Sequence, residues 1–417
     1  MKIKKNVLLT FVVFIFCIAL TGTTQAAWVN EFRAINFNTS EATTSLAMTG
    51  KNGSAVIAWS EANAAGVYQG YCKAHIGGSW LPLGSALNID RAQHCNIYDA
   101  TMMNSNSFVS FFEMDRASGN LHSHILMWNG STWERIAYDL HVNLGAIRYT
   151  AYPAICNNGT DIFTAINDFS RLYVYQISGK TQTLLPSSTV SPYGTIASGY
   201  LDISSGGAML CDVIKIAAAK DGNPYVAFTE RSGGISQLYV KTWNGADWVQ
   251  PVTGPLNIDS SQNVYLCDID ISPIDNSPLV VWTEINSAGT HNLYAKKYDS
   301  AAGAWVSCTL PSGITNLNVG SVTYPSIAFN KERRITSDHI GYITWTEQNT
   351  DTGGYDVHAA KLTSATTVTP ISDRLNYMTP RDLANNTDIF VDNQGAHVVW
   401  TESDAASNYE LNGKRWQ

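Results

Sequence analysis

Two acidic residues on one short segment are the clearest candidates for acid–base chemistry in this sequence. Asp268 and Asp270 stand one residue apart in the largely apolar run 264–271. Because side chains alternate along a β-strand, a strand here would present both carboxylates on one face. Glycosidases use such a carboxylate pair to cleave their substrates. Hydrogen-bonded acids at the edge of a core are the simpler interpretation, which we favour.

A second pair, His122 and His124, alternates in the same way and could reach one metal ion. No third ligand stands nearby in the sequence, so we predict no metal site and no cofactor. The chain contains no Gly-x-Ser-x-Gly, no phosphate-binding glycine loop, no His-Glu-x-x-His and no calcium-loop motif. An active site assembled from distant segments would carry no such motif.

Glutamate recurs at the end of a repeated segment and could form a ring of carboxylates on one face of the molecule. A feature present in nearly every repeat is one that folding needs, so we interpret each acid as an acceptor for backbone N–H groups or a partner of a strand lysine such as Lys241 or Lys296. We interpret the tryptophans two residues before four of them as packing residues. The structural repeat positions are Glu61, Glu113, Glu230, Glu284, Glu347 and Glu402, with Trp59, Trp282, Trp345 and Trp400.

These residues belong to a unit that recurs about every 55 residues. Its clearest copies are Tyr225–Glu230, Leu279–Glu284, Tyr342–Glu347 and His397–Glu402, and Asn167 takes the acid's place in a degenerate copy. Each unit holds about four runs of β-branched and aromatic residues separated by turn residues. Recurrent Leu-Asn pairs are predicted to form turns; their Asn residues are Asn88, Asn257, Asn318 and Asn376.

Seven units of four strands predict an all-β, seven-bladed β-propeller with four-stranded antiparallel blades. The last unit stops near Gln417, about where its third strand should end. Its missing outer strand stands at the other end of the chain, because the step from Trp28 to Asn36 equals that from Trp80 to Asn88. We therefore expect the N-terminal strand to pair with the C-terminal blade and close the ring, which removes unpaired sheet edges.

The composition is acidic, with 26 basic against 34 acidic residues and a formal charge of -8. Such a chain is repelled by nucleic-acid phosphates and by anionic membrane surfaces. Basic Lys2, Lys4 and Lys5, an apolar stretch and the small-residue site before Ala27 predict a signal peptide over 1–26. We expect an exported single domain over 27–417, in the periplasm, outside the cell or on its surface, with no membrane span after signal removal.

Six cysteines remain once Cys17 leaves with the signal peptide. An even number in an exported chain suggests disulfides, and the sequence does not select among the possible pairings. Buried free thiols are the alternative, because a core of this size needs no covalent links. The six are Cys72, Cys95, Cys156, Cys211, Cys267 and Cys308.

The segments Tyr225–Glu230 and Leu238–Trp248 carry a further indication. They resemble secreted bacterial seven-bladed propellers whose blades bear Tyr-Val-Ala-Trp-x-Glu followed by Leu-Tyr-Val-Lys-x-Trp-Asn-Gly-x-x-Trp. The resemblance covers 27–417 and implies a lectin-like or sialidase-like propeller of non-catalytic type. Sialidase-like turns of the Ser-x-Asp-x-Gly-x-x-Trp kind do not recur, and arginine is sparse.

Departures from the repeat, chiefly the extra Gly- and Ser-rich segment 191–210, are where loops can vary on a rigid scaffold. Tyrosines with a few Arg and His around a channel mouth suit stacking on sugars or seating a peptide. The candidate ligand-binding residues on the blade-to-blade connections are His94, Arg148, Tyr149, Tyr193, Tyr200, Asp202, Tyr265, Tyr324 and Arg381, and Tyr152 accompanies them.

We therefore predict a binding module without catalytic activity that recognises a glycan or an extracellular protein through this face. The alternative is a polysaccharide-cleaving glycosidase or lyase with acids near the central channel. A second alternative is a structural component of a cell-surface assembly. The sequence does not identify the ligand or the oligomeric state.

Overall fold

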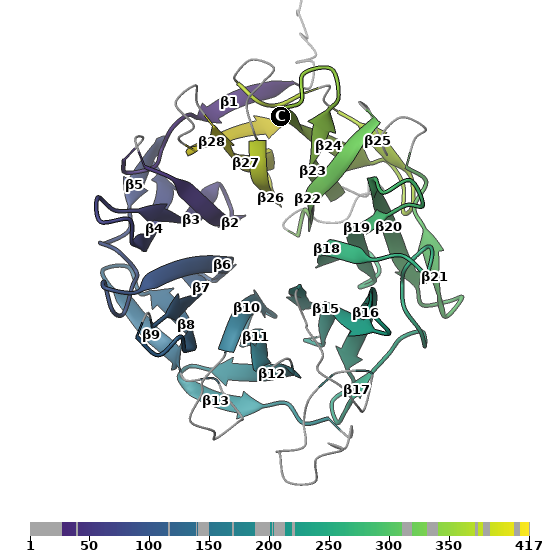
Figure 1. Ribbon diagram of the computed structural model, residues 1–417. Helices are drawn as coiled ribbons and strands as arrows, with labels where there is room; N and C mark the ends of the chain where they lie inside the picture. The colour runs from purple at the N-terminus through teal and green to yellow at the C-terminus, as the bar shows by residue number, and fades with distance from the viewer. Residues whose placement is uncertain are drawn as a thin grey trace, which may run out of the picture.

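Seven sheets of four antiparallel strands surround a central axis, as Figure 1 shows. The predicted all-β, seven-bladed propeller is confirmed. The described residues form strands and turns but no helix, and none of them belongs to a helix that could cross a membrane. The computed structural model describes residues 27–38, 41–115, 117–138, 140, 150–168, 171–187, 201, 203, 213–218, 222–310, 319–331, 341–371, 374–377, 384–403 and 409–416.

The blades follow one another along the chain, and the first strand of each faces the ring centre (Figure 1). Blades 1 to 4 are β2 (Thr43–Lys51), β3 (Ser54–Ala62), β4 (Tyr68–Ile76), β5 (Ser79–Pro82); β6 (His94–Met103), β7 (Asn106–Met114), β8 (Leu121–Trp128), β9 (Trp133–Tyr138); β10 (Thr150–Asn157), β11 (Ile162–Asp168), β12 (Arg171–Ser178), β13 (Thr181–Leu184); and β14 (Ile214–Ala218), β15 (Pro224–Ser232), β16 (Ile235–Trp243), β17 (Trp248–Val249). Blades 5 to 7 are β18 (Val264–Ile271), β19 (Pro278–Ile285), β20 (His291–Asp299), β21 (Ala304–Ser307); β22 (Val319–Phe329), β23 (Gly341–Asn349), β24 (Tyr355–Leu362), β25 (Val368–Pro370); and β26 (Ala384–Asp392), β27 (Gly395–Ser403), β28 (Tyr409–Trp416) with β1 (Trp28–Phe32).

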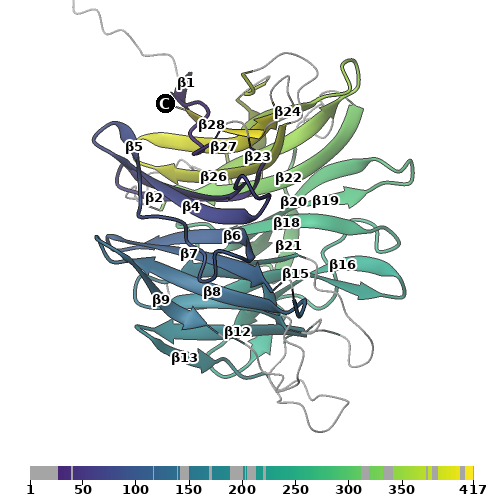
Figure 2. The ribbon, with the colours of Figure 1, turned by 60° about the vertical axis from the view of Figure 1, so that its left-hand side comes forward.

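The core lies between neighbouring blades, which stack face to face in Figure 2. Trp282 of blade 5, for example, packs in one cluster with Val240 of blade 4. Its side chain is completely buried, as are the side chains of Trp59, Trp345 and Trp400. The alternating apolar residues of each second strand therefore serve two interfaces at once, and burial of large aromatic rings stabilises the stack.

The chain ends close the ring, as the sequence predicts. Strand β1 pairs antiparallel with β28, with Trp28 opposite Trp416. Asn36 accepts a hydrogen bond from the backbone N–H of Leu411 (3.5 Å). Asn88 accepts the equivalent bond from Gly70 within blade 1 (2.9 Å). The N-terminal segment therefore supplies the outer strand and the turn that the last blade lacks.

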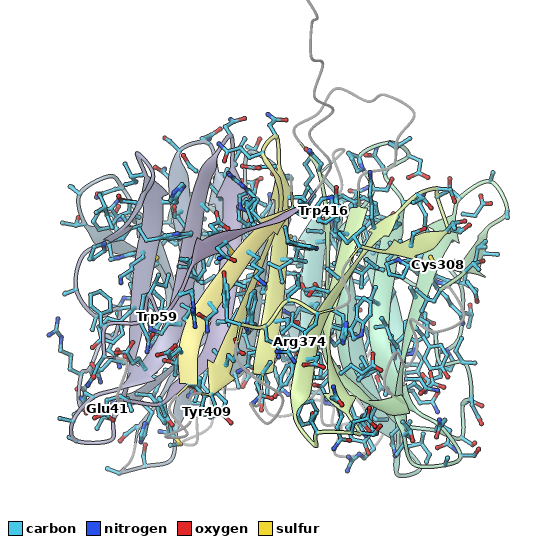
Figure 3. The ribbon with its side chains drawn as sticks, turned by 90° about the horizontal axis from the view of Figure 1, so that it is seen from above. Glu41, Trp59, Cys308, Arg374, Tyr409 and Trp416 are labelled. Carbon is cyan, nitrogen blue, oxygen red and sulfur yellow. The ribbon has the colours of Figure 1, made fainter. Side chains whose placement is uncertain are left out.

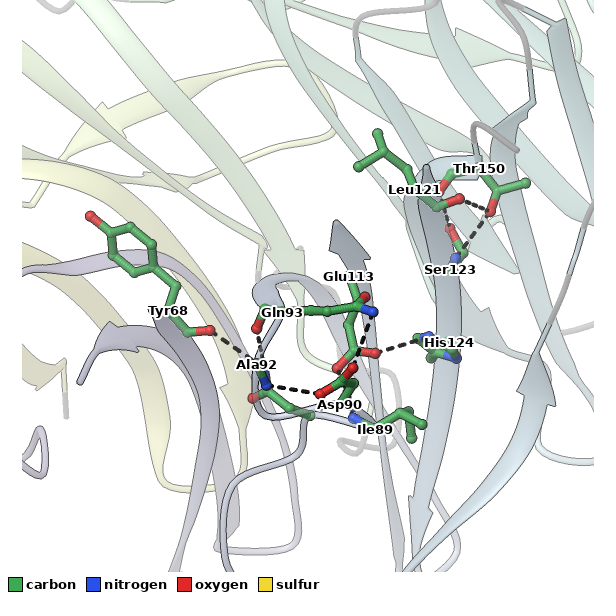
Figure 4. Close-up of polar contacts among 11 residues, drawn as sticks. Tyr68, Ile89, Asp90, Ala92, Gln93, Glu113, Leu121, Ser123, His124 and Thr150 are labelled. Carbon is green, nitrogen blue, oxygen red and sulfur yellow. Dashed lines mark hydrogen bonds and ion pairs between the residues drawn. The ribbon is translucent and has the colours of Figure 1, made fainter. Parts of the chain in front are cut away.

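The recurrent acids hold the connections between blades, which meet one face of the disc. Figure 3 shows this face from the side, with Glu41 and Tyr409 at its edge. Figure 4 shows Glu113, which accepts the backbone N–H groups of Ile89 (2.7 Å) and Asp90 (3.3 Å). A buried carboxylate that accepts two backbone N–H bonds satisfies groups that would otherwise be costly to bury.

Strand pairing corrects the degenerate repeat. The sequence places Asn167 where the other units carry glutamate. In the structure, Thr150 pairs with Asp168 as Ala384 pairs with Glu402. Asp168, which is buried, is therefore the equivalent acid. The sequence pattern did not identify Asp168 because the other six units carry Glu at this position.

The disulfide expectation finds no support in the part of the chain that the structure describes. Cys72, Cys95, Cys156, Cys267 and Cys308 are all free and buried. They are distributed over four separate apolar clusters, and only Cys72 and Cys95 share one. Burial raises the pKa of the Cys308 thiol to about 12, as expected of an unreactive core thiol. Cys211 lies outside the described residues.

A buried histidine fastens the closing strand. His397 of β27 is 2% exposed, and its Nδ1 lies 2.9 Å from Glu31 Oε1 on β1. Its Nε2 lies 3.1 Å from Asp392 Oδ1. Burial alone would lower the pKa of His397, but hydrogen bonds and charge from Asp392 and Glu31 raise it above the ordinary 6.5.

Replacing Glu31 with Gln should lower the melting temperature in a pH-dependent way. A raised histidine pKa contributes stability that is fully present below about 6.5 and is lost as pH rises through the folded-state value. The gap between wild type and Glu31→Gln should therefore be largest near pH ~5.5 and shrink by pH ~9. Glu134→Gln, at an exposed ion pair with Lys180, is the control. A gap that stays constant over this range would contradict the assignment.

Candidate active site

One position on the first strand of every blade faces the centre of the ring. This residue pairs with the second-strand residue that lies three positions before the recurrent acid. We call the seven first-strand residues at this position the central ring. Four blades carry an ionisable group there, three aspartates and one lysine. The members are Ala47, Asp99, Ala154, Lys215, Asp268, Ser326 and Asp388. The repeat sets this position structurally, while its residue type differs from blade to blade.

A cavity of about 450 Å³ begins at the central ring. Its walls are the first strands between this ring and the turns that lead into the second strands. Asn158, Pro273 and Asn276, which belong to those turns, line its mouth. The cavity therefore opens on the face opposite the blade-to-blade connections. Its volume is within the range of small-molecule sites.

Each central-ring aspartate links its blade to the next one. Asp99 accepts the backbone N–H of Ile155 (2.9 Å), and Asp388 accepts that of Met48 (2.7 Å). Each also accepts the N–H of the residue that follows it. These bonds hold the carboxylates in fixed orientations while the side chains remain partly exposed to the cavity.

A serine connects the other two carboxylates. The Oγ of Ser326 lies 2.8 Å from Asp268 Oδ2 and 3.0 Å from Asp388 Oδ1. One hydroxyl proton cannot satisfy two ionised acceptors fully, so this contact favours a proton shared within the group. The two carboxylate oxygens lie within two hydrogen-bond lengths of each other, about 6 Å at most.

Burial and mutual repulsion shift the protonation of these acids. Burial raises the pKa of Asp99 to about 7, against the lowering effects of Lys215 and two backbone N–H bonds. Burial and then the charge of Asp268 raise the pKa of Asp388 to about 6, with Lys215 again opposing. Burial also raises the pKa of Asp268. A cluster of acids with separated and elevated pKa values is a mark of catalytic sites.

Lys215 supplies the positive charge at the centre of this group. Burial would lower its pKa, but Asp268 first and then Asp99, Tyr98 and Asp388 raise it, so the ammonium stays protonated. The Tyr98 ring makes a cation–π contact with this ammonium, since Lys215 Nζ lies 5.6 Å from the ring centre. A fixed cation beside three carboxylates keeps part of the cluster ionised at neutral pH.

A second layer lies two residues farther along the first strands, nearer the mouth. Asp270 accepts the backbone N–H of Phe329 (2.8 Å), and its Oδ1 lies 2.6 Å from Lys331 Nζ. The Lys331 side chain is 54% exposed and lines the cavity. The predicted pair of Asp268 and Asp270 therefore faces one cavity, but the two acids occupy different layers with different partners.

The residues predicted to bind a ligand on the connection face are dispersed in the structure. Tyr265 is exposed and its ring lies tilted against that of His291, with ring centres 4.4 Å apart. His94 accepts the backbone N–H of Tyr68, and Tyr324 has a positive φ of 48° at a bulge. These three residues belong to different blades, and none of them lines the cavity. Arg148, Tyr149, Tyr193, Tyr200, Asp202 and Arg381 lie outside the described residues.

The sequence interpretation missed most of the central ring. It singled out Asp268 and passed over Asp99, Lys215 and Asp388. Asp99 and Asp388 each lie 14 residues before the recurrent Glu of their repeat, so an equal step could have found these two. Lys215 lies 15 residues before Glu230, because the turn between its strands differs in length. The sequence interpretation also did not single out Lys331, which lines the cavity. The histidine pair gains no third ligand, since no group of three metal-binding side chains occurs in the described parts of the chain.

No protein-family model matches this chain, and no curated protein matches its sequence. Solved structures match its fold. An α-L-arabinanase from Penicillium chrysogenum, complexed with arabinobiose, is 10% identical with a TM-score of 0.50, covering 84% of this chain and all of that one. An α-L-arabinofuranosidase from Fusarium graminearum is 8% identical with a TM-score of 0.49, covering 93% and 97%. The propeller domain of the Trilobed protease from Pyrococcus furiosus is 9% identical, with a TM-score of 0.48 and coverage of 90% and 97%.

These findings contradict the predicted non-catalytic binding module. The arabinanase that shares the fold is a glycan-cleaving enzyme, and the cleaving alternative agrees with this match better than the main prediction does. The error arose because the sequence argument looked for function in the variable connections. It overlooked the side chains that differ at one structurally equivalent position.

Replacing Lys215 with Met should destabilise the protein increasingly as pH rises. The three ring aspartates have raised pKa values, so ionising them costs stability, and Lys215 opposes this cost. The melting-temperature gap to wild type should be small near pH ~4 and large near pH ~8.

Lys297→Met is the matched control for this variant. Lys297 is also buried, and it pairs with Asp275 outside the cavity at 2.5 Å. The pKa of Asp275 is lowered despite its burial, through hydrogen bonds and the charge of Lys297, so the control gap should be flat between pH ~5 and ~8. A flat profile for Lys215→Met would show that the lysine does not govern the ionisation of the ring.

Proposed function

We propose that this protein is a glycoside hydrolase that cleaves a neutral glycan in the central cavity. The observation that carries the proposal is the pKa of Asp99, raised to about 7, beside carboxylates held by Lys215 and Ser326. Glycosidic cleavage needs a protonated acid near the leaving oxygen and an ionised carboxylate nearby. We propose that Asp99 donates the proton.

Asp268 is the best candidate for the ionised carboxylate. Among the charges that act on Lys215, that of Asp268 has the largest effect. Asp268 also accepts hydrogen bonds from Ser326 Oγ and from the backbone N–H of Ile327 (2.9 Å). These contacts oppose burial, which raises the pKa of Asp268, and they favour the charged form that a base or a nucleophile requires. Asp388 contacts the same Ser326 hydroxyl, and its protonation state changes the net charge of the cluster.

The cavity fits a lyase or a sialidase less well. A lyase needs a neutral base, but the Lys215 ammonium is held protonated and no histidine lines the cavity among the described residues. The same described lining contains no arginine, which is the side chain that binds a sugar carboxylate in bidentate fashion. These features favour an uncharged sugar at the ring. Export through the segment 1–26 is part of the proposal, because it would bring the enzyme to extracellular polysaccharide.

Replacing Asp99 or Asp268 with Asn should lower kcat by about 10²- to 10⁴-fold, the usual contribution of positioned acid–base groups. The assay is release of reducing ends from neutral polysaccharides, beginning with α-L-arabinan because an arabinanase shares the fold.

Asp392→Asn is the matched control for these substitutions. Asp392 also links two blades, through the backbone N–H of Gly53 (2.9 Å), but it lies outside the cavity. Its variant should retain wild-type kcat in the folded fraction. Equal losses in all three variants would indicate a structural effect only, and undiminished activity in the ring variants would refute the proposed roles.

The pH dependence of kcat/KM should show a basic limb near 7. Asp99 acts in its protonated form, so activity falls as pH rises through its raised pKa. Residual activity of Asp99→Asn should lack this limb. A wild-type profile that stays flat between pH ~6 and ~9 would assign the proton donor to another group.

A further inference from the structure

We propose, on the basis of the proposed hydrolase function, that the enzyme attacks only the ends of its substrate chains. The inference follows from the shape of the cavity, which the central ring closes at its base. An enzyme that cleaves inside a long chain needs a site open at two ends, whereas a blind pocket admits only a terminus.

The cavity wall begins at the central ring on blades 2, 4, 5, 6 and 7, and one residue nearer the mouth on blades 1 and 3, where the ring position is alanine. From blade 5, for example, it includes Asp268 to Ile271, and from blade 2 it includes Asp99 to Met102. The preceding residues of those strands, Cys267 and Tyr98, do not line it. Among the described residues, the lining therefore extends from the ring toward the mouth and includes none on the connection-face side of the ring.

Tyr98 closes one half of the base. It stands at a bulge next to Asp99, and its hydroxyl donates a hydrogen bond to the backbone oxygen of Ile214 in blade 4 (2.8 Å). The Ile214 N–H donates back to the same hydroxyl at 3.3 Å. The tyrosine thus reaches from blade 2 past blade 3, where the central ring has only the small Ala154.

The hydrogen bonds of Ser326 close the other half. They join Asp268 of blade 5 to Asp388 of blade 7, across blade 6. Behind them, Thr387 Oγ1 donates to the backbone oxygen of Tyr324 (2.5 Å). Asp388 in turn accepts the backbone N–H of Met48 in blade 1. The base is therefore bridged by polar contacts from blade 2 to blade 4 and from blade 5 round to blade 1.

The depth of the pocket limits how much of the chain can enter. Three strand steps separate Asp268 from Ile271 near the mouth, which corresponds to about 10 Å. The proposed proton donor and base lie at the bottom of this depth. Asp270 and Lys331 lie one layer above and offer polar groups to the next sugar residue. Cleavage should therefore release a monosaccharide or a disaccharide.

The product pattern of the wild-type protein tests the inference. The substrates are linear neutral oligosaccharides of graded length, each in a free-ended form and in a form blocked at both ends. We expect a mono- or disaccharide as the first product at the earliest time points, and at least about a tenfold slower reaction on blocked chains. Intermediate-length products from the first turnovers, with blocked chains cleaved at equal rates, would overturn end recognition while supporting hydrolysis.

Binding to Asp99→Asn separates this inference from the function itself. Affinity should rise with chain length up to about two residues and then change less than about twofold, and blocked chains should bind weakly. End-specific binding without any cleavage by wild type would support the pocket and overturn the hydrolase. Neither binding nor cleavage would overturn both, and affinity that keeps rising with length would overturn the pocket.

Substitutions at Tyr98 test the base directly. Tyr98→Ala should open the pocket and shift the products toward longer fragments, whereas Tyr98→Phe keeps the ring and should retain short products. Tyr265→Ala, at an exposed tyrosine on the connection face, is the control and should leave the pattern unchanged. Melting curves establish that each variant is folded. An unchanged pattern in folded Tyr98→Ala would exclude Tyr98 as the barrier.

Discussion

The buried carboxylate at the end of each second strand is the interaction on which the ring depends. In blade 5, Glu284 accepts the N–H groups of Ile258 and Asp259 and the indole N–H of Trp282, at 2.7 to 2.9 Å. One side chain therefore fixes the incoming connection, its own strand and the aromatic ring between blades. Without it, several buried donors would lose their acceptor at once, which is more costly than the loss of one exposed bond. Because this bond recurs around the ring, it specifies the spacing of the blades.

A rigid repeated frame allows individual positions to differ. The central ring shows this most clearly, since Ala47, Lys215 and Ser326 occupy equivalent places with unrelated chemistry. The ring aspartates still take part in the frame, because Asp99 and Asp388 each bind the next blade's backbone. The structural bonds orient these carboxylates before any substrate arrives. Pre-organised groups of this kind favour catalysis because they need no reorganisation during the reaction.

The fold could be predicted almost completely from the sequence. The repeated Trp-Thr-Glu endings reveal the blades, and the equal steps from Trp28 to Asn36 and from Trp80 to Asn88 reveal the closure.

The site could not be predicted in the same way. Asp99, Lys215 and Asp388 are far apart in the sequence, and only the closed ring brings them together. Their shifted pKa values depend on burial and mutual charge, which a linear pattern does not contain.

The connections drew attention for a reason that holds in many proteins, since variable loops often carry function. Here the exposed Tyr265 and the strained Tyr324 belong to separate blades, whereas the cavity lies toward the opposite face.

The strand register decides which residues of blade 3 are equivalent to those of the other blades. Strand pairing identified Asp168 as the acid of blade 3, and this register places Ala154 in the central ring. The small alanine leaves space for Tyr98 to cross.

The most direct test of this account is a carbon-13 NMR titration of aspartate carboxyl groups in the intact protein, with Asp99→Asn used to assign the signal. The account predicts that the Asp99 carboxyl titrates near 7, as burial among the ring charges requires. An Asp99 carboxyl that titrates at the ordinary aspartate value of about 4 would contradict it, because the cavity would then hold no proton donor at neutral pH.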